Sequence, residues 1–371
     1  MNAENVKVQA APEPSLPERR REALQQEAAT KVRWTFKRGL AGTGVIFLGA
    51  IVASLQFVRP TAAAPLGPFA RIANADSVLA VGASANAFGA SREVRLRFAL
   101  PDKPTEFPVE VSGDPSSLSY AWIPARDTTA DTELRPVNGS SFVAPSRPGF
   151  YHLALVRGST RQILAEPTLA VMVPFEQKVG GMLNGYRIGT YLADRLRHKD
   201  HPAGFLQVNE SDLALKVSKH LRLGDFITHD QANVWPKYVA LNPRLLDKLE
   251  LVLAKIGGHT AFAEVAGEDD DAQDVAFDVH SGFRTPAHNS GVWRAAKDSR
   301  HQYGDAADVA IDADGDGRVT LKDETIVARA VDQVESEHPD LIGGLGLYTS
   351  HHYRTPYVHI DARGKRSRWK G

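Results

Sequence analysis

The 371-residue sequence predicts a multi-domain chain with one N-terminal transmembrane helix, a small all-β sandwich domain and a C-terminal α+β domain. Three observations predict this fold class. An uncharged apolar run lies near the N-terminus, short alternating strand-like runs follow between residues 77 and 175, and helix and strand patterns mix after residue 175. At roughly 150 residues per domain, the chain is long enough for about two folded domains.

The predicted membrane span covers residues 39–58, GLAGTGVIFLGAIVASLQFV. As a helix it would reach about 30 Å, the thickness of the hydrocarbon core of a bilayer. Basic residues crowd the segment before it, and few follow, so the positive-inside rule places the N-terminus in the cytoplasm. The alternatives are a buried core helix and a cleaved signal peptide, for which Ala62–Ala64 could serve, although Pro65 would then follow the cut.

The predicted domain boundaries follow changes in composition. Residues 1–38 are expected to form a largely disordered cytoplasmic tail, 59–75 a linker, 76–174 the β-sandwich and 175–371 the α+β domain. Within the sandwich, the stretch PGFYHLAL resembles a late strand of immunoglobulin-like modules, and a spacer role is the simplest interpretation. In the last domain, Asn242 and Pro243 predict the start of a helix that continues to Ile256.

Charge and cysteine content exclude several functions. Lysine plus arginine and aspartate plus glutamate number 44 each, so the chain lacks the positive field that would bind nucleic acid through its phosphates. The sequence has no cysteine, which excludes disulfides and thiolate metal sites. Histidine and carboxylate side chains are therefore the available metal ligands.

Two segments supply such ligands. SRHQYGDAAD places His301 seven residues before Asp308, and YVHID forms an alternating run in which Tyr357, His359 and Asp361 share one face of a strand. Two imidazoles and one carboxylate would make a three-ligand site that leaves zinc an open position for water. Spacing alone leaves open that these histidines are ordinary core or surface residues.

Four strings carry a family resemblance: SGFRTPAHN at 281–289, SRHQYGDAAD at 299–308, GGLGLY at 343–348 and YVHIDARGKRSRW at 357–369. Together they resemble the zinc D-alanyl-D-alanine carboxypeptidase and Hedgehog-type family, in particular its peptidoglycan-hydrolase branch. The resemblance covers roughly residues 205–369 and leaves the first 175 residues unexplained.

The resemblance implies a zinc peptidase fold for the C-terminal domain, with zinc bound by His301, Asp308 and His359. It also implies that Arg284 faces the substrate, where a guanidinium can hold a carboxylate or an oxyanion. The alternative for Arg284 is a structural pairing with an acidic loop. The implied location is the bacterial inner (cytoplasmic) membrane, crossed once, with the catalytic domain in the periplasm or outside the cell.

The general base is the point at which the sequence departs from the family. Carboxypeptidases of this family often carry an acid three residues before the last histidine ligand, a position held here by Pro356. The candidates to accept the proton of the attacking water are Asp361, His352, His351 and Asp305. Asp361 could equally orient a ligand histidine.

A second metal motif occupies residues 312–323, DADGDGRVTLKD. The pattern is that of an EF-hand-type calcium loop, with predicted ligands Asp312, Asp314, Asp316, Arg318 and Asp323. The last position holds aspartate where glutamate is usual, as in dockerin-type loops, which is expected to weaken binding. The alternative is a glycine-rich turn with solvated aspartates.

These observations predict a membrane-anchored zinc peptidase that acts on peptidoglycan stem peptides or cross-links, with a structural calcium ion. The alternative is a non-catalytic, metal-stabilised module that binds the cell wall or a partner, and a third possibility is a peptide substrate outside the wall. The basic C-terminal segment, residues 363–370, is read as a solvated tail or a weak contact for anionic wall polymer. Carboxypeptidase or endopeptidase action, bond type and oligomeric state are not encoded in these motifs.

Overall fold

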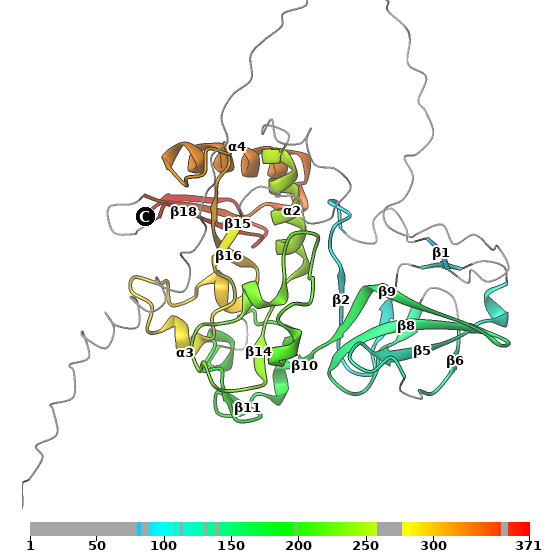
Figure 1. The fold of residues 1–371 in the computed structure, drawn as a ribbon. Helices are drawn as coiled ribbons and strands as arrows, with labels where there is room; N and C mark the ends of the chain where they lie inside the picture. The colour runs from blue at the N-terminus through cyan, green and yellow to red at the C-terminus, as the bar shows by residue number, and fades with distance from the viewer. Residues whose placement is uncertain are drawn as a thin grey trace, which may run out of the picture. The chain divides into compact units, whose positions relative to one another are not determined.

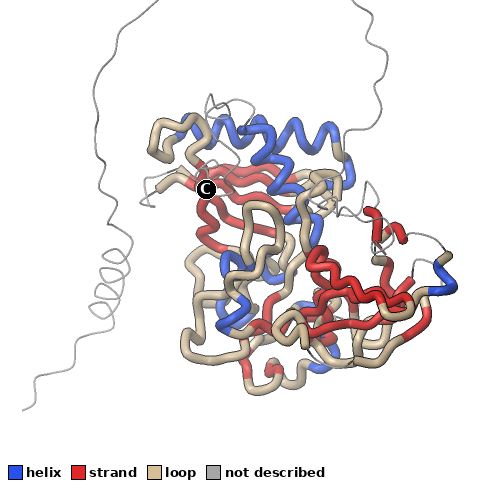
Figure 2. Tube along the Cα trace, turned by 45° about the vertical axis from the view of Figure 1, so that its right-hand side comes forward, coloured by secondary structure: helices blue, strands red, loops and turns tan. Residues whose placement is uncertain are grey.

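The structure is a computed structural model. In its described residues β-strands dominate and helices are few (Figures 1 and 2). The structure describes residues 80–82, 89–107, 109–111, 114–129, 132–137, 141–196, 199–257, 277–349 and 355–371. These residues fall in one compact unit. The predicted tail, membrane span and linker, residues 1–75, lie outside the described residues.

The predicted fold class needs correction. No helix among the described residues is long and apolar enough to cross a membrane, so the structure does not support a fold with a transmembrane helix. The predicted single-pass location in the inner membrane depended on that helix and is corrected with it. Within the described part of the chain, the two long helices, residues 243–257 and 321–337, are amphipathic and bury one face in the core, so neither is a candidate span.

The N-terminal β region also differs from the predicted two-layer sandwich. Its main sheet has the order β2-β9-β8-β5-β6, formed by Leu96–Ala99, Thr160–Val171, Gly149–Arg157, Ser119–Pro124 and Arg135–Pro136. Separate two-stranded pairs are formed by β1 with β4 (Ala80–Gly82, Glu110–Val111) and by β3 with β7 (Pro104–Glu106, Ser141–Val143). Strand β2 joins β9 in parallel, so this sheet is mixed, unlike the antiparallel sheets of an immunoglobulin-like sandwich.

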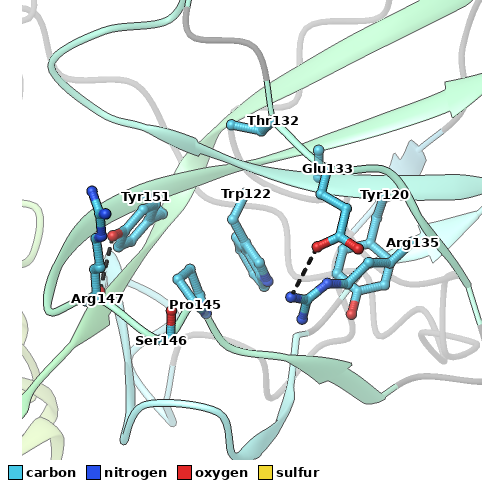
Figure 3. A pocket seen from close by; sticks show the side chains of 10 residues that line it. Tyr120, Trp122, Thr132, Glu133, Arg135, Pro145, Ser146, Arg147 and Tyr151 are labelled. Carbon is cyan, nitrogen blue, oxygen red and sulfur yellow. Dashed lines mark hydrogen bonds and ion pairs between the residues drawn. The ribbon is translucent and has the colours of Figure 1, made fainter.

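A pocket of about 180 Å³ lies on this β region (Figure 3). Trp122 stands between Tyr151 on one side and the Glu133–Arg135 pair on the other. Its indole Nε1 donates a hydrogen bond to the carbonyl of Val143 at 2.8 Å, and the residue is only 7% exposed. Because these contacts are those of a core aromatic, the pocket reflects the packing of the sheet.

The C-terminal region is built on a five-stranded sheet with the order β15-β16-β18-β17-β19. Its strands are Phe277–Ser281, Ala306–Ile311, Tyr357–Asp361, Gly344–Tyr348 and Ser367–Lys370. Helices α2 (Pro243–Gly257) and α4 (Leu321–Glu337) pack against each other, and α4 contacts β16, β17 and β18 (Figure 1). The short helix α3 is Pro286–Asn289. Smaller ladders join β10, β13 and β14 (Val173–Pro174, Gly204–Val208, Lys237–Val239), and β11 with β12 (Met182–Leu183, Tyr186–Arg187).

The predicted helix from Pro243 and the predicted YVHID strand are confirmed as α2 and β18. The Asn242 side chain accepts a hydrogen bond from the Arg244 amide at 3.0 Å, as its place before the helix indicated. One buried apolar cluster contains Leu96 and Ala170 of the β region together with Leu246 of α2. Packing therefore continues across the boundary predicted between residues 174 and 175.

Candidate metal centre

Two neighbouring strands and one short turn bring the three predicted zinc ligands together. Asp308 of β16 lies directly opposite His359 of β18 in the antiparallel ladder. His301 comes from the 3-10 turn Arg300–Tyr303, which precedes β16. His301 Nε2 lies 3.2 Å from Asp308 Oδ1 and 3.1 Å from His359 Nδ1, and the last two atoms are 2.9 Å apart. This buried group could hold a metal ion.

Hydrogen bonds on the far side of each imidazole determine which nitrogen faces the group. His301 Nδ1 lies 2.7 Å from the carbonyl of Gly282, which can only accept, so Nδ1 carries the proton and Nε2 keeps its lone pair. His359 Nε2 lies 3.1 Å from the carboxylate of Asp361, which can accept its proton, so a bound cation would meet the lone pair of Nδ1. Three lone pairs, with that of Asp308, therefore converge where a bound cation would satisfy them.

The separations also fit a small ion. A tetrahedral ion with bonds of about 2.0–2.1 Å places its ligand atoms roughly 3.3 Å apart. The measured separations of 2.9–3.2 Å are close to this value. Two imidazoles and one carboxylate leave a fourth coordination position, and the three side chains line a cavity of about 560 Å³. The site is therefore both compatible with a metal and accessible to a ligand.

Charge and burial set the protonation states of the three residues. Burial lowers the pKa of His301, which keeps its ring neutral near pH 7. Burial alone would raise the pKa of Asp308, but charge interaction and hydrogen bonding with His301 and His359 hold it well below its usual range. Burial opposes charge on His359 too, yet hydrogen bonds with Asp308 and Asp361 raise its pKa. Protons therefore compete with metal mainly at His359.

Arg284, predicted to face the substrate, lines the same cavity. Its Nη2 forms an ion pair with Asp308 Oδ2, and its Nε donates to the hydroxyl of Ser281 at 2.7 Å. The alternative for Arg284 was a structural pairing with an acidic loop. Its acidic partner is instead Asp308, a member of the metal group.

The structure separates the candidates for the general base. Asp361 is fully buried, and its carboxylate accepts hydrogen bonds from His359, the Gly344 amide at 2.7 Å and Arg363, which fits the orienting role. Asp305 is buried and ion-paired with Arg300.

His351 and His352 lie outside the described residues. They belong to the segment that joins two cavity-lining residues, Tyr348 and Tyr357.

Sequence reasoning missed an aromatic wall beside the metal group. The Trp369 ring lies 5.1 Å from the His359 ring, and its Nε1 donates to the Tyr348 hydroxyl at 3.0 Å. Tyr348 stacks on Tyr357 at 4.6 Å. A Cβ at Gly346 would clash with the Trp369 ring. The glycines of GGLGLY were therefore the one signal in the sequence that a large group packs closely against this strand.

A second group that could hold a metal consists of Asp312, Asp314 and Asp323. Asp312 accepts hydrogen bonds from the amides of Asp316 at 3.2 Å and Gly317 at 2.8 Å, and Gly317 takes a positive φ of 84°. The predicted ligand Asp316 is not part of this group, and Arg318, at loop position 7, would bind through its backbone carbonyl, so its prediction stays a prediction. Instead, Asp316 Oδ1 accepts a hydrogen bond from the Arg318 amide at 2.8 Å.

Comparison of the chain with protein-family models and with curated proteins gave no match. The family resemblance of the four strings therefore stays a prediction.

Proposed function

We propose that this chain is a zinc-dependent peptidase that cleaves peptide stems or cross-links of peptidoglycan. The observation that carries the proposal is the convergence of the lone pairs of His301, Asp308 and His359 on one point in the wall of an open cavity. Zinc held there supplies a Lewis acid and lowers the pKa of a coordinated water towards 7.

The ligand chemistry supports zinc over calcium or magnesium at this group. Two of the three donors are imidazole nitrogens, whereas calcium and magnesium select oxygen ligands. Burial keeps the ligands out of bulk water, and the hydrogen bonds to Gly282 and Asp361 fix both rings. Such outer contacts typically contribute 10–100-fold to metal affinity.

Arg284 would both hold Asp308 and bind substrate. A guanidinium has five N–H donors. The contacts with Asp308 and Ser281 use its Nη2 and Nε groups, which leaves donors for a substrate carbonyl or carboxylate. The same cavity is lined by Arg294, Arg300 and Arg363. Although Asp305 and Asp361 pair with the last two, the lining with Arg284 and Arg294 favours a substrate that carries a carboxylate. Peptidoglycan stem peptides meet this requirement, as the resemblance of the four strings implies.

We propose His352 as the proton acceptor, with its neighbour His351 as the alternative. Among the described residues that line the cavity, the carboxylates are Asp298 and Asp308. Asp298 accepts a hydrogen bond from the Tyr303 hydroxyl at 2.5 Å, and Asp308 contacts Arg284. A histidine near neutral pKa is a common general base.

For residues 312–323 we propose a structural calcium ion. The three carboxylates of the group are hard oxygen donors of the kind that calcium selects. The loop begins at Asp312, the residue after β16. An ion that fixes the loop would therefore also fix the end of the strand that carries Asp308.

The proposal is tested by incubating purified muropeptides with zinc-loaded protein and analysing the products by mass spectrometry. We expect released amino acid or cleaved cross-links with the wild type and none with His359→Ala. Asp298→Asn, which changes the cavity without touching a metal ligand, is the matched control. A zinc-loaded wild type that binds sacculi but releases no peptide would instead support the non-catalytic binding module.

A further inference from the structure

A buried ion pair contacts the backbone of Asp361, the residue whose carboxylate binds the ring of His359. Lys248 of α2 and Glu335 of α4 have side chains that are 0% and 1% exposed, and Lys248 Nζ lies 2.7 Å from Glu335 Oε1. Arg368 contacts the other oxygen of Glu335 at 2.6 Å. None of these residues lines the cavity.

Both members of the pair contact the backbone that holds Asp361. Lys248 Nζ donates to the carbonyl of Asp361 at 2.7 Å, and Glu335 Oε1 accepts from the Gly343 amide at 3.0 Å. The next amide, Gly344, donates to the Asp361 carboxylate at 2.7 Å. The contacts form a closed ring from α2 through α4 and the turn before β17 to β18.

The turn in this ring fits tightly. A Cβ on Gly343 would clash with the Asp361 carbonyl, and one on Gly344 would clash with its carboxylate. The turn therefore limits where the Asp361 carboxylate can lie, and Glu335 is one of the groups that hold the turn. A shift of either would move the acceptor that fixes the tautomer of His359.

Stability alone is a poor explanation for this pair. Removing two charges from water is expensive, and replacing a buried pair by apolar residues of similar size is often neutral or stabilising. Burial lowers the pKa of Lys248 even though the hydrogen bond to Glu335 acts in the opposite direction, which shows that desolvation dominates at the ammonium group. The ammonium group of the pair instead donates a hydrogen bond to the Asp361 carbonyl.

We propose that Lys248 and Glu335 are positioning residues of the metal centre, which hold Asp361 so that the Nδ1 lone pair of His359 points at the ion. The inference rests on metal binding in the proposed function, and it does not depend on peptidase activity or on the substrate. It predicts that a folded variant without the pair binds metal more weakly than the wild type and holds it in an altered ligand geometry.

The test replaces the pair by apolar residues of similar length, Lys248→Met with Glu335→Leu. In competition with a chromophoric chelator, we expect the zinc affinity of this variant to fall about 10–100-fold, the range typical of outer contacts to a metal ligand. Urea unfolding of the metal-free protein should still show one cooperative transition, with a lowered midpoint because the Gly343 amide and the Asp361 carbonyl lose their partners. Zinc affinity is therefore compared without urea, where both proteins are folded.

The matched control is the exposed ion pair between the same two helices, Lys255 and Glu337, in which the ammonium lies 2.7 Å from the carboxylate. Lys255→Met with Glu337→Leu should leave zinc affinity within about twofold of the wild type. Cobalt(II) absorption gives a second readout, because altered ligand geometry changes the intensity of the visible bands. We expect such a change in the Lys248/Glu335 variant but not in the control.

If the apolar variant does not fold, Glu335→Gln provides the test, since it keeps the size but leaves one oxygen for the Lys248, Gly343 and Arg368 donors that two carboxylate oxygens now accept. Its zinc affinity should also fall. The inference is overturned if a folded variant at positions 248 and 335 binds zinc as tightly as the wild type. A wild type that binds no zinc would instead overturn the metal centre itself, so the two failures are distinguishable.

Discussion

His359 lies between two carboxylates, with Asp308 at Nδ1 and Asp361 at Nε2. A neutral imidazole has one proton to donate. Asp361 is fully buried and also accepts a hydrogen bond from Arg363, so its carboxylate is held in place to accept a hydrogen bond from His359 Nε2. The Nδ1 lone pair is then directed at the point where His301 and Asp308 meet.

This arrangement predicts the effect of Asp361→Asn on metal binding. The amide can present either an acceptor or a donor to His359, so the preference for one tautomer weakens. We expect zinc affinity to fall about 10–100-fold in chelator competition. Asp298→Asn, at the cavity wall, should bind zinc like the wild type, and equal affinities for all three proteins would argue against an orienting role for Asp361.

Asp361 also predicts how the stability of the metal-free protein depends on pH. Burial alone would raise its pKa, but hydrogen bonds from His359 and Arg363 outweigh burial and lower the pKa below its ordinary value of 3.8. A carboxyl group with a lowered folded pKa stabilises the fold above its unfolded pKa, and this stabilisation is lost as pH falls towards the folded value.

Below about pH 4, wild-type stability should therefore fall faster than that of Asp361→Asn, by up to about 1.4 kcal/mol for each pH unit. Urea unfolding of chelator-treated proteins at about pH 4.5 and about pH 3 measures the difference. Parallel losses in the two proteins would show that Asp361 does not carry this linkage.

At the scale of elements, the sequence predicted strands and helices better than it predicted their partners. The alternation of YVHID predicts a strand, and the Asn242-Pro243 pair predicts the start of α2, because both signals are local. The pairing of β16 with β18 and of β17 with β19 depends on tertiary packing. Trp369, which reaches the metal group through β19, therefore could not be predicted from its neighbours in the sequence.

The loop between β16 and α4 carries a prediction at this scale. The Asp314 carboxylate forms an ion pair with Lys322 at 2.7 Å, and the Lys322 ammonium would compete with a cation for it. About 1 mM calcium should raise the melting temperature of the wild type by roughly 3–5 °C, for a dissociation constant near 0.1 mM.

Asp314→Ala should abolish this shift, because it removes one of the three carboxylates, and Lys322→Ala should increase it. Differential scanning fluorimetry with and without calcium provides the measurement. If calcium does not change the wild-type melting temperature, the loop binds no calcium and is a glycine-rich turn with solvated aspartates.

For the whole molecule, composition limited the functions but did not settle the architecture. The lack of cysteine left histidine and carboxylate as ligands, and the structure brings together the three residues that the motifs singled out. The predicted fold class was wrong in two respects. Period-2 runs identify strands without saying how sheets join, and no helix among the described residues is long and apolar enough to cross a membrane. Strand β2 joins the sheet in parallel with β9, and its Leu96 packs in the same core as α2.

The central claim is that one divalent ion binds between two strands and the turn before them. Zinc-edge X-ray absorption of the protein loaded with one equivalent of zinc tests it most directly. The predicted first shell contains two imidazole nitrogens and oxygen donors at about 2.0–2.1 Å, and one imidazole should be lost in His301→Ala. Failure to retain one zinc per chain, or a first shell without two imidazoles, would contradict the account.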